Sequence, residues 1–237
     1  MPHRLIFGYA GTNWVGDKIR PYLQLESSAV EAKDDEIFVY PDPLWRNFGS
    51  WGTLGGWVLG PHASPADGDG DIVFTRKIIE YMKENYCIDG DRIFATGHSW
   101  GGDMSEILAC FADDDFRATA PVAANRPYWF EPSPGDFIDC HGDTAMWVLF
   151  GVDDDHFAGS QSYPGEFGDD QRDYWLDTYG CDGEDAFSDL GFGGSNECVE
   201  YSGCSPALRY CLYDGKYGHQ IPKDYFARAV MEFFRSF

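Results

Sequence analysis

The chain has 237 residues, and 17 Lys and Arg against 40 Asp and Glu give it a formal charge of −23. A surface with this charge repels phosphate backbones and anionic lipid heads, which argues against nucleic acid as a partner. About twenty apolar residues are needed to span a bilayer, but the longest apolar runs are short pieces such as Trp147–Phe150, so we expect no membrane association. At this length we expect one domain over residues 1–237 and favour a monomer.

Six short runs rich in β-branched and aromatic residues predict strands. These runs are Leu5–Tyr9, Ile37–Tyr40, Arg92–Thr96, Thr119–Ala123, Met146–Phe150 and Arg209–Tyr213. Between the second and third, apolar residues recur every four positions and predict a helix over Ile72–Tyr86, with Asp71 as its N-cap.

Two further helices follow from the same periodicity. One begins close behind Ser99, where the apolar positions are Met104, Ile107, Leu108 and Phe111. The other ends the chain, with Pro222 and Asp224 in its first turn and an apolar stripe of Phe226, Val230, Phe233 and Phe237. This alternation predicts an α/β fold with a mostly parallel sheet covered on both faces. The stretches Pro41–Gly70 and Gly180–Ser205 lack periodicity and are expected to be functional or stapled loops.

Seven cysteines crowd toward the second half of the chain, four of them in a stretch rich in Gly, Ser and Asn. This pattern is typical of disulfides formed in an oxidising compartment, so we expect a secreted protein. A zinc site is the alternative, but C-x-x-C spacing is absent and no metal is expected. Residues 1–4 lead directly into an apolar strand without the features of a signal peptide, so a leader is expected to lie outside this sequence.

The strongest chemical signal is Gly97-His98-Ser99-Trp100-Gly101, a G-x-S-x-G motif between a predicted strand and a predicted helix. The pattern also arises by chance in Gly- and Ser-rich turns. In this context, however, the small glycines allow a sharp turn that presents the serine hydroxyl at a helix N-terminus, where a developing anion is favoured. The motif predicts Ser99 as the nucleophile of acyl transfer.

A serine nucleophile needs a base, which comes last in the order serine, acid, histidine. His141, His156 and His219 all qualify by order, and we favour His219 because it lies between the last strand and the last helix. The acid is expected just after Met146–Phe150, where Asp153, Asp154 and Asp155 are consecutive. We favour Asp154 and leave its two neighbours as alternatives.

Acyl transfer also needs two backbone N–H groups that stabilise an oxyanion. One belongs to the residue after the nucleophile, Trp100. The other comes from the loop after the first strand, Gly11-Thr12-Asn13, and we assign it to Thr12. This mechanism requires no metal or organic cofactor.

With these residues in place, the sequence resembles carbohydrate esterases of the feruloyl esterase and acetylxylan esterase type, which are related to polyhydroxybutyrate depolymerases. The resemblance covers nearly the whole chain and is carried by Arg4–Tyr9, Tyr86–Asp89 with Arg92–Gly102, and Gly218-His219 with Pro222. It implies an α/β-hydrolase fold with Ser99, Asp154 and His219 as the triad. One departure is Ala10, where the family's oxyanion loop usually carries histidine. Family members also usually have strands before Leu5, so the sheet is expected to lack those first strands.

The resemblance also implies disulfides. It suggests a pair between Cys110 and Cys140, bridges among Cys181, Cys198, Cys204 and Cys211, and no partner for Cys87.

For the substrate, the resemblance favours feruloyl esters of arabinoxylan, or a small aromatic ester. Acetylxylan is the second choice, and a polyester such as polyhydroxybutyrate is the third. A peptidase or lipase on the same fold remains open, since the fold does not fix the acyl group. The alternative outside enzymes is a polysaccharide-binding protein that uses aromatic loops.

Overall fold

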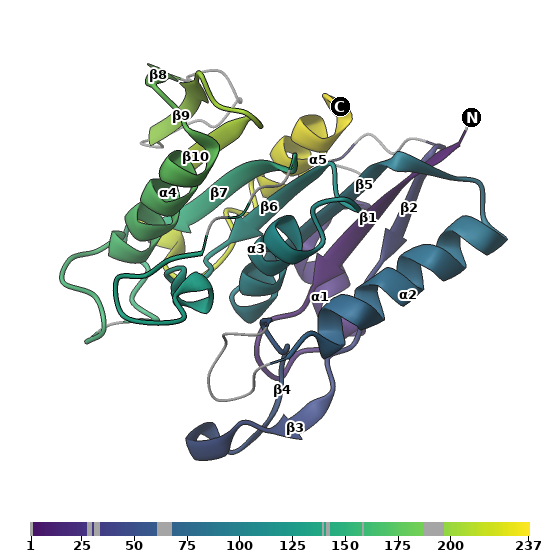
Figure 1. The fold of residues 1–237 in the computed structure, drawn as a ribbon, viewed down its shortest axis with the longest axis horizontal. Coiled ribbons are helices and arrows are strands. Elements are labelled where there is room, and N and C mark those ends of the chain that lie inside the picture. Colours follow the sequence, from purple (N-terminus) through teal and green to yellow (C-terminus); the bar gives the residue numbers. More distant parts are fainter. Residues whose placement is uncertain are drawn as a thin grey trace.

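An eight-stranded sheet runs through the computed structural model, and helices cover both of its faces (Figure 1). The structure describes residues 2–27, 30, 34–60, 68–138, 140, 143–157, 159–186 and 197–237. In spatial order the strands are β2 (Glu36–Val39), β1 (His3–Tyr9), β5 (Ile88–His98), β6 (Ala118–Val122), β7 (Ala145–Gly151), β10 (Leu208–Tyr213), β9 (Glu197–Ser202) and β8 (Gly183–Ala186). The pairs from β2 to β10 are parallel, and β9 and β8 continue the sheet antiparallel.

Apolar side chains of the central strands form two layers, because successive residues alternate between the faces of a sheet. In β1, Leu5 and Phe7 pack in one layer, and Ile6 packs in the other. The first layer lies under α2 (Gly70–Asn85), α3 (Trp100–Phe111) and α4 (Glu166–Tyr179). The second lies under α1 (Gly16–Leu23) and α5 (Phe226–Arg235). The mostly parallel α/β-hydrolase sheet predicted from the sequence is therefore confirmed.

All six predicted strands and three predicted helices are present, but two helix starts differ from the prediction. Asp71 does not cap α2, which begins at Gly70. Its buried carboxylate instead accepts the Val58 N–H at 2.7 Å and forms an ion pair with Arg46. Pro222 and Asp224 precede α5, which begins at Phe226 and buries Phe226, Val230 and Phe233 as its stripe predicts.

The stretch Pro41–Gly70, expected to be a loop, contains a small hairpin of β3 (Trp45–Asn47) and β4 (Thr53–Gly55). The hairpin projects at the carboxyl ends of the parallel strands, and both chain termini lie at the opposite end of the sheet (Figure 1). It is tied to the loop after β1, since the Asn13 N–H donates to Gly55 O at 2.8 Å and the Gly55 N–H donates to Asn13 Oδ1 at 3.0 Å.

Three disulfides join described parts of the chain. Cys110 pairs with Cys140, Cys181 with Cys204, and Cys198 with Cys211, while Cys87 is exposed and free. The pairing that the resemblance implied is confirmed. Such bridges fit a protein of an oxidising compartment.

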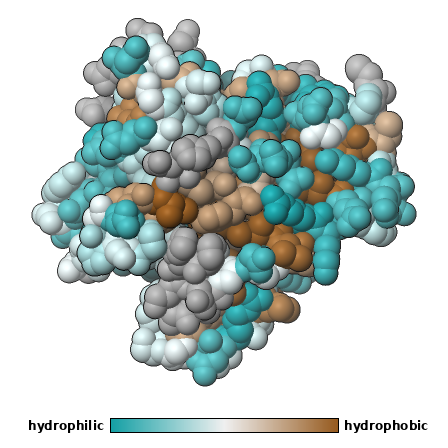
Figure 2. Space-filling view, in the orientation of Figure 1, coloured by the Kyte–Doolittle hydropathy of each residue, from teal (hydrophilic) through white to brown (hydrophobic). Residues whose placement is uncertain are grey.

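The face that carries α2, α3 and α4 has a band of hydrophobic surface across its middle, surrounded by hydrophilic residues (Figure 2). Val73 and Phe74, near the start of α2, are each 39% exposed. Among the described residues, no helix is long and apolar enough to cross a membrane.

Candidate active site

Ser99 lies at the sharp turn between β5 and α3, with φ 57° and ψ −126°. A positive φ is strained for a residue with a Cβ and persists only where the surroundings enforce it. Two glycines make room for this turn: a Cβ on Gly97 would collide with the carbonyl of Gly101, and a Cβ on Gly101 would collide with the carbonyl of Tyr9. The motif glycines are therefore needed for the close packing of β1, β5 and α3.

The structure brings the three predicted triad residues into one hydrogen-bonded chain. The His219 Nε2 atom is 3.0 Å from Ser99 Oγ, and its Nδ1 atom is 2.8 Å from Asp154 Oδ2. The Asp154 side chain is fully buried, and its second oxygen accepts the His156 N–H at 3.0 Å. With Asp154 accepting from Nδ1–H, the Nε2 atom of a neutral imidazole is left free to accept the Ser99 proton.

The loops that carry the acid and the histidine pack directly on each other. Gly151, the last residue of β7, lies against the carbonyl oxygen of Gly218, where a Cβ would collide. The loop that carries His219 is also held by α1, because the Tyr22 hydroxyl oxygen accepts the Ile221 N–H at 3.1 Å. Because β7 and β10 are adjacent parallel strands, their carboxyl ends deliver both loops to the same edge of the sheet.

Two further histidines enclose His219. The buried His98 ring donates its Nε2–H to the carbonyl oxygen of His219 at 2.7 Å, and burial lowers the pKa of His98 to about 3, so this ring is neutral. The His156 ring stacks on His219 with centroids 4.0 Å apart and planes 12° apart. Burial, and then the charge of His219, lower the pKa of His156.

The other candidates for acid and base occupy different positions. The Asp153 carboxylate lies against Gly215, and Asp155 is exposed near Gly218. Neither makes the contact with His219 Nδ1 that Asp154 makes. His156 stacks on His219 instead of reaching Ser99, and His141 lies outside the described residues.

The two predicted oxyanion donors flank the serine. Trp100 is the first residue of α3, and the first helical hydrogen bond is made by the Gly102 N–H to Ser99 O at 2.7 Å. Gly11 lies so close that a Cβ on it would be 3.3 Å from Ser99 Cβ, and the next residue, Thr12, lines the same cavity as Ser99. The loop is anchored where Ala10 O accepts the Trp57 Nε1–H at 2.7 Å.

A cavity of about 150 Å³ opens beside Ser99. Most of its wall is aromatic or apolar, and Trp51, on the hairpin turn, is 49% exposed at its mouth. Its lining consists of Thr12, Trp51, Leu54, Ser99, Trp100, Asp103, Asn125, Trp129, His156 and Phe157. Both predicted oxyanion residues, Trp100 and Thr12, therefore share one cavity with Ser99.

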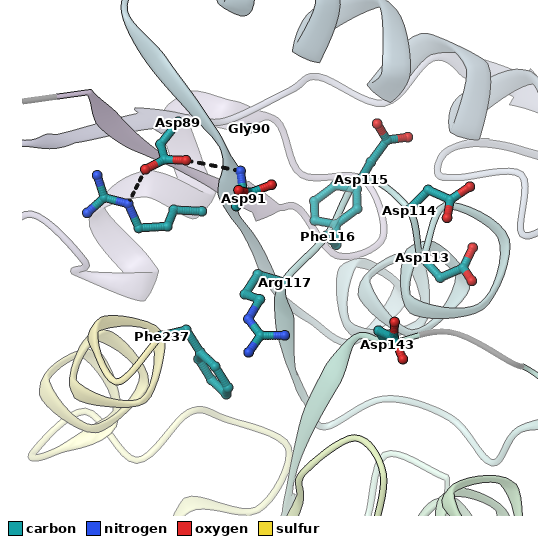
Figure 3. Close-up of a pocket in the computed structure, with 11 residues that line it drawn as sticks. Asp89, Gly90, Asp91, Asp113, Asp114, Asp115, Phe116, Arg117, Asp143 and Phe237 are labelled. Carbon is teal, nitrogen blue, oxygen red and sulfur yellow. Dashed lines mark hydrogen bonds and ion pairs between the residues drawn. The ribbon is translucent and has the colours of Figure 1, made fainter.

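A second, larger depression of about 700 Å³ lies at the amino ends of β5, β6 and β7, away from Ser99. Figure 3 shows six aspartates around it, with the side chain of Arg117 turned toward the ring of Phe237. Asp89 is held by Arg92 at 2.7 Å. Across the described ranges, no group of three or more His, Cys, Asp or Glu is arranged to hold a metal ion.

The chain shares its fold with solved esterases. An acetyl xylan esterase from Aspergillus awamori superimposes with a TM-score of 0.64 at 14% identity, covering 99% of this chain and 89% of that one. A Bacillus cereus carboxylesterase superimposes with a TM-score of 0.54 at 13% identity, covering 99% and 88%. The fold and the serine turn define an α/β-hydrolase.

Sequence relatives show which family of α/β-hydrolases the chain belongs to. No protein-family model matches the chain. Feruloyl esterase C of Emericella nidulans is 30% identical over 224 residues, which cover 92% of this chain and 70% of that protein. A probable feruloyl esterase C of Aspergillus niger is 29% identical over 226 residues, with the same coverage. The chain belongs to the feruloyl esterase family and is a carboxylic ester hydrolase of the carbohydrate esterase type.

Sequence reasoning missed several residues that shape the site. The sequence shows His98 only as a variable position of the G-x-S-x-G motif, and Asp103 is not among the predicted site residues. Trp57 and Asn13 support the loop after β1 through contacts 47 and 42 residues away in sequence. Among these residues, only Asp103 could have been noticed from the sequence, because it is an acidic residue in the first turn of a mostly apolar helix.

Proposed function

We propose that this chain is a secreted serine esterase that releases feruloyl groups from the arabinoxylan of plant cell walls. The observation that carries the proposal is the hydrogen-bonded chain from Ser99 Oγ through His219 to the buried Asp154. The names of the relatives support the feruloyl group. The three disulfides support secretion.

In the acylation step, Ser99 Oγ attacks the ester carbonyl carbon while His219 Nε2 takes the hydroxyl proton. The resulting oxyanion accepts hydrogen bonds from the N–H groups of Trp100 and Thr12, next to the positive end of α3. When the intermediate collapses, His219 Nε2–H protonates the departing sugar oxygen. Ser99 is then left as an acyl ester, and the sugar hydroxyl leaves.

Deacylation repeats these steps with water. His219 Nε2 takes a proton from water, whose oxygen attacks the acyl carbon, and the proton returns to Ser99 Oγ as the free acid leaves. Asp154 holds the imidazole in the required tautomer and stabilises the imidazolium formed in each half-reaction. His98 fixes the backbone on the other side of the base through the His219 carbonyl. This mechanism requires neither a metal nor an organic cofactor.

The first test is hydrolysis of methyl ferulate beside 4-nitrophenyl acetate, with wild type and Ser99→Ala in parallel. Wild type should release ferulate, and the substitution should lower kcat/KM by about 10⁴-fold or more, since loss of the nucleophile leaves only binding and oxyanion stabilisation. Release of acetate alone would point to an acetylxylan esterase. Ferulate release by Ser99→Ala at the wild-type rate would refute the serine mechanism.

A further inference from the structure

The triad holds the two nitrogens of the His219 ring, but it does not hold the flat faces of that ring. The Nδ1 atom is 2.8 Å from Asp154 Oδ2, and the Nε2 atom is 3.0 Å from Ser99 Oγ. Rotation about the last side-chain torsion of a histidine is soft, because this torsion has no sharp staggered minima. Such a rotation tilts the ring out of the plane in which both contacts are made. The alignment of the base therefore also depends on the side chains that cover its faces.

One face of the His219 ring is covered by the ring of His156. The two planes are 12° apart and their centroids are 4.0 Å apart, which is a nearly parallel stack at contact distance. The other neighbouring rings are oriented differently: His98 is tilted by 54° at 4.9 Å, and Phe157 is perpendicular at 5.5 Å. A parallel stack opposes tilting directly, because a tilt of one ring brings its atoms into contact with the other.

The position of His156 is itself fixed by the triad acid. Its backbone N–H donates to Asp154 Oδ1 at 3.0 Å, and the Gln161 side-chain amide donates to Asp154 O at 3.0 Å. The ring of Phe157 meets the His156 ring at 87°, with centroids 5.0 Å apart. One oxygen of the Asp154 carboxylate thus orients the edge of the His219 ring, and the other places the residue that covers its face.

The stack requires an uncharged His156, because His219 becomes a cation in each half-reaction. Two imidazolium rings in contact would repel each other. Partial burial, and then the charge of His219, lower the pKa of His156, while Asp154 and Asp155 act in the opposite direction. His98 is neutral as well, with a pKa lowered by burial to about 3. The base therefore ionises beside two uncharged rings.

We propose that His156 is a positioning residue whose uncharged ring keeps the His219 imidazole aligned with Ser99 through both half-reactions. This inference rests on the proposed function, because it concerns the base of that reaction. It assigns the contribution to the face of the His156 ring and not to a hydrogen bond from its nitrogens. The His156 side chain is exposed, so it can be replaced without removing part of the core.

The test measures kcat and KM for 4-nitrophenyl acetate, whose small acyl group depends little on the cavity wall that His156 contributes. His156→Ala removes the stack and should lower kcat about 10-fold, the loss expected for a favourable aromatic pair. The KM should stay within about 3-fold of wild type, because the ring acts on the transition state and not on binding.

Two further variants separate the ring from its nitrogens. His156→Phe keeps a flat, uncharged ring and should return kcat to within about 3-fold of wild type. His156→Gln keeps hydrogen-bonding groups without a ring and should be as slow as His156→Ala. Asp155→Asn is the matched control, since Asp155 is the exposed neighbour in the same loop, and it should keep the wild-type kcat.

Proton NMR checks the stack itself. The carbon-bound ring protons of His219 lie over the face of the His156 ring, so its ring current shifts their resonances to high field. His156→Ala should move these resonances to lower field, and His156→Phe should keep them at high field. A loss of stability that left the stack in place would not produce this pattern.

A kcat of His156→Ala within about 2-fold of wild type overturns the inference, because this is the smallest effect expected of an aromatic pair. A His156→Phe variant no faster than His156→Ala, or a His156→Gln variant as fast as wild type, also overturns it. In these cases ferulate release by wild type, abolished in Ser99→Ala, leaves the proposed function standing. If wild type hydrolyses neither 4-nitrophenyl acetate nor methyl ferulate, the proposed function and the inference fail together.

Discussion

At the scale of single residues, Asp154 has both carboxylate oxygens engaged, one by the His219 ring and one by the His156 backbone N–H. Asp154→Asn replaces one acceptor with an amide and favours the wrong imidazole tautomer. We expect kcat for 4-nitrophenyl acetate to fall about 10⁴-fold while the protein stays folded. Steady-state kinetics and circular dichroism together check this prediction.

The control for this substitution is Asp155→Asn, one position further along the same loop, where the side chain is exposed. It should leave kcat within about 3-fold of wild type, because Asp155 does not contact the imidazole and substitutions of exposed residues change stability little. A loss of less than about 10-fold in Asp154→Asn would contradict its role as the orienting acid.

Much of the candidate site was predictable because its residues follow strand ends. A predicted strand precedes each of the three residues Ser99, Asp154 and His219. Adjacent parallel strands have their carboxyl ends at the same edge of the sheet, so these residues are expected to lie close together. The sequence could not separate Asp154 from Asp153 and Asp155, because only the turn after β7 decides which carboxylate faces the imidazole. The stacking of His156 on His219 depends on the same turn and left no pattern in the sequence.

At the scale of elements, the disulfide between Cys198 and Cys211 joins β9 to β10, the strand that leads to His219. Replacing both cysteines with alanine should lower the free energy of unfolding by about 3 kcal/mol. The disulfide closes a short loop and so reduces the entropy of the unfolded chain by about this amount, and the variant lacks that restriction. Urea denaturation measures the change. Cys87→Ser, at the exposed free cysteine, should change it by less than about 0.5 kcal/mol.

Elements with strong apolar patterns were predicted, and those held by long-range polar contacts were not. The helix α1 is mostly polar, contains Pro21, and buries only Gly16, Ile19 and Leu23, so its sequence has a weak helical signal. The hairpin of β3 and β4 is stabilised partly by Asn13, which is distant in sequence. Asp71 resembled a helix cap, but its carboxylate is bound by Arg46 and the Val58 N–H.

At the scale of the whole molecule, stability should depend on pH through a buried acid. Glu106 is fully buried, and burial, followed by the charge of Asp103, raises its pKa well above the usual value. The folded protein therefore holds a proton that the unfolded chain releases above about pH 4.3. Its contribution to stability is fully present below that pH and is lost as pH rises toward the folded pKa.

Glu106→Gln removes this titration. The free energy of unfolding of the variant, minus that of wild type, should increase between pH 5 and pH 8 by up to about 1.4 kcal/mol per pH unit. The difference between the two proteins cancels the opposite contribution of His98, whose lowered pKa reduces stability as pH falls below about 6.5. Chemical denaturation at several pH values measures it, and a constant difference would contradict the prediction.

The disulfide between Cys181 and Cys204 spans the interval between β8 and β9. Proteolytic cleavage between Ala186 and Glu197 would leave Ser99 and Asp154 on one fragment and His219 on the other. Each of the other two disulfides lies within a single fragment. The cleaved enzyme would therefore persist as a two-chain molecule in oxidising surroundings, and its fragments could part only after reduction, so a reductant would govern how long a nicked enzyme survives.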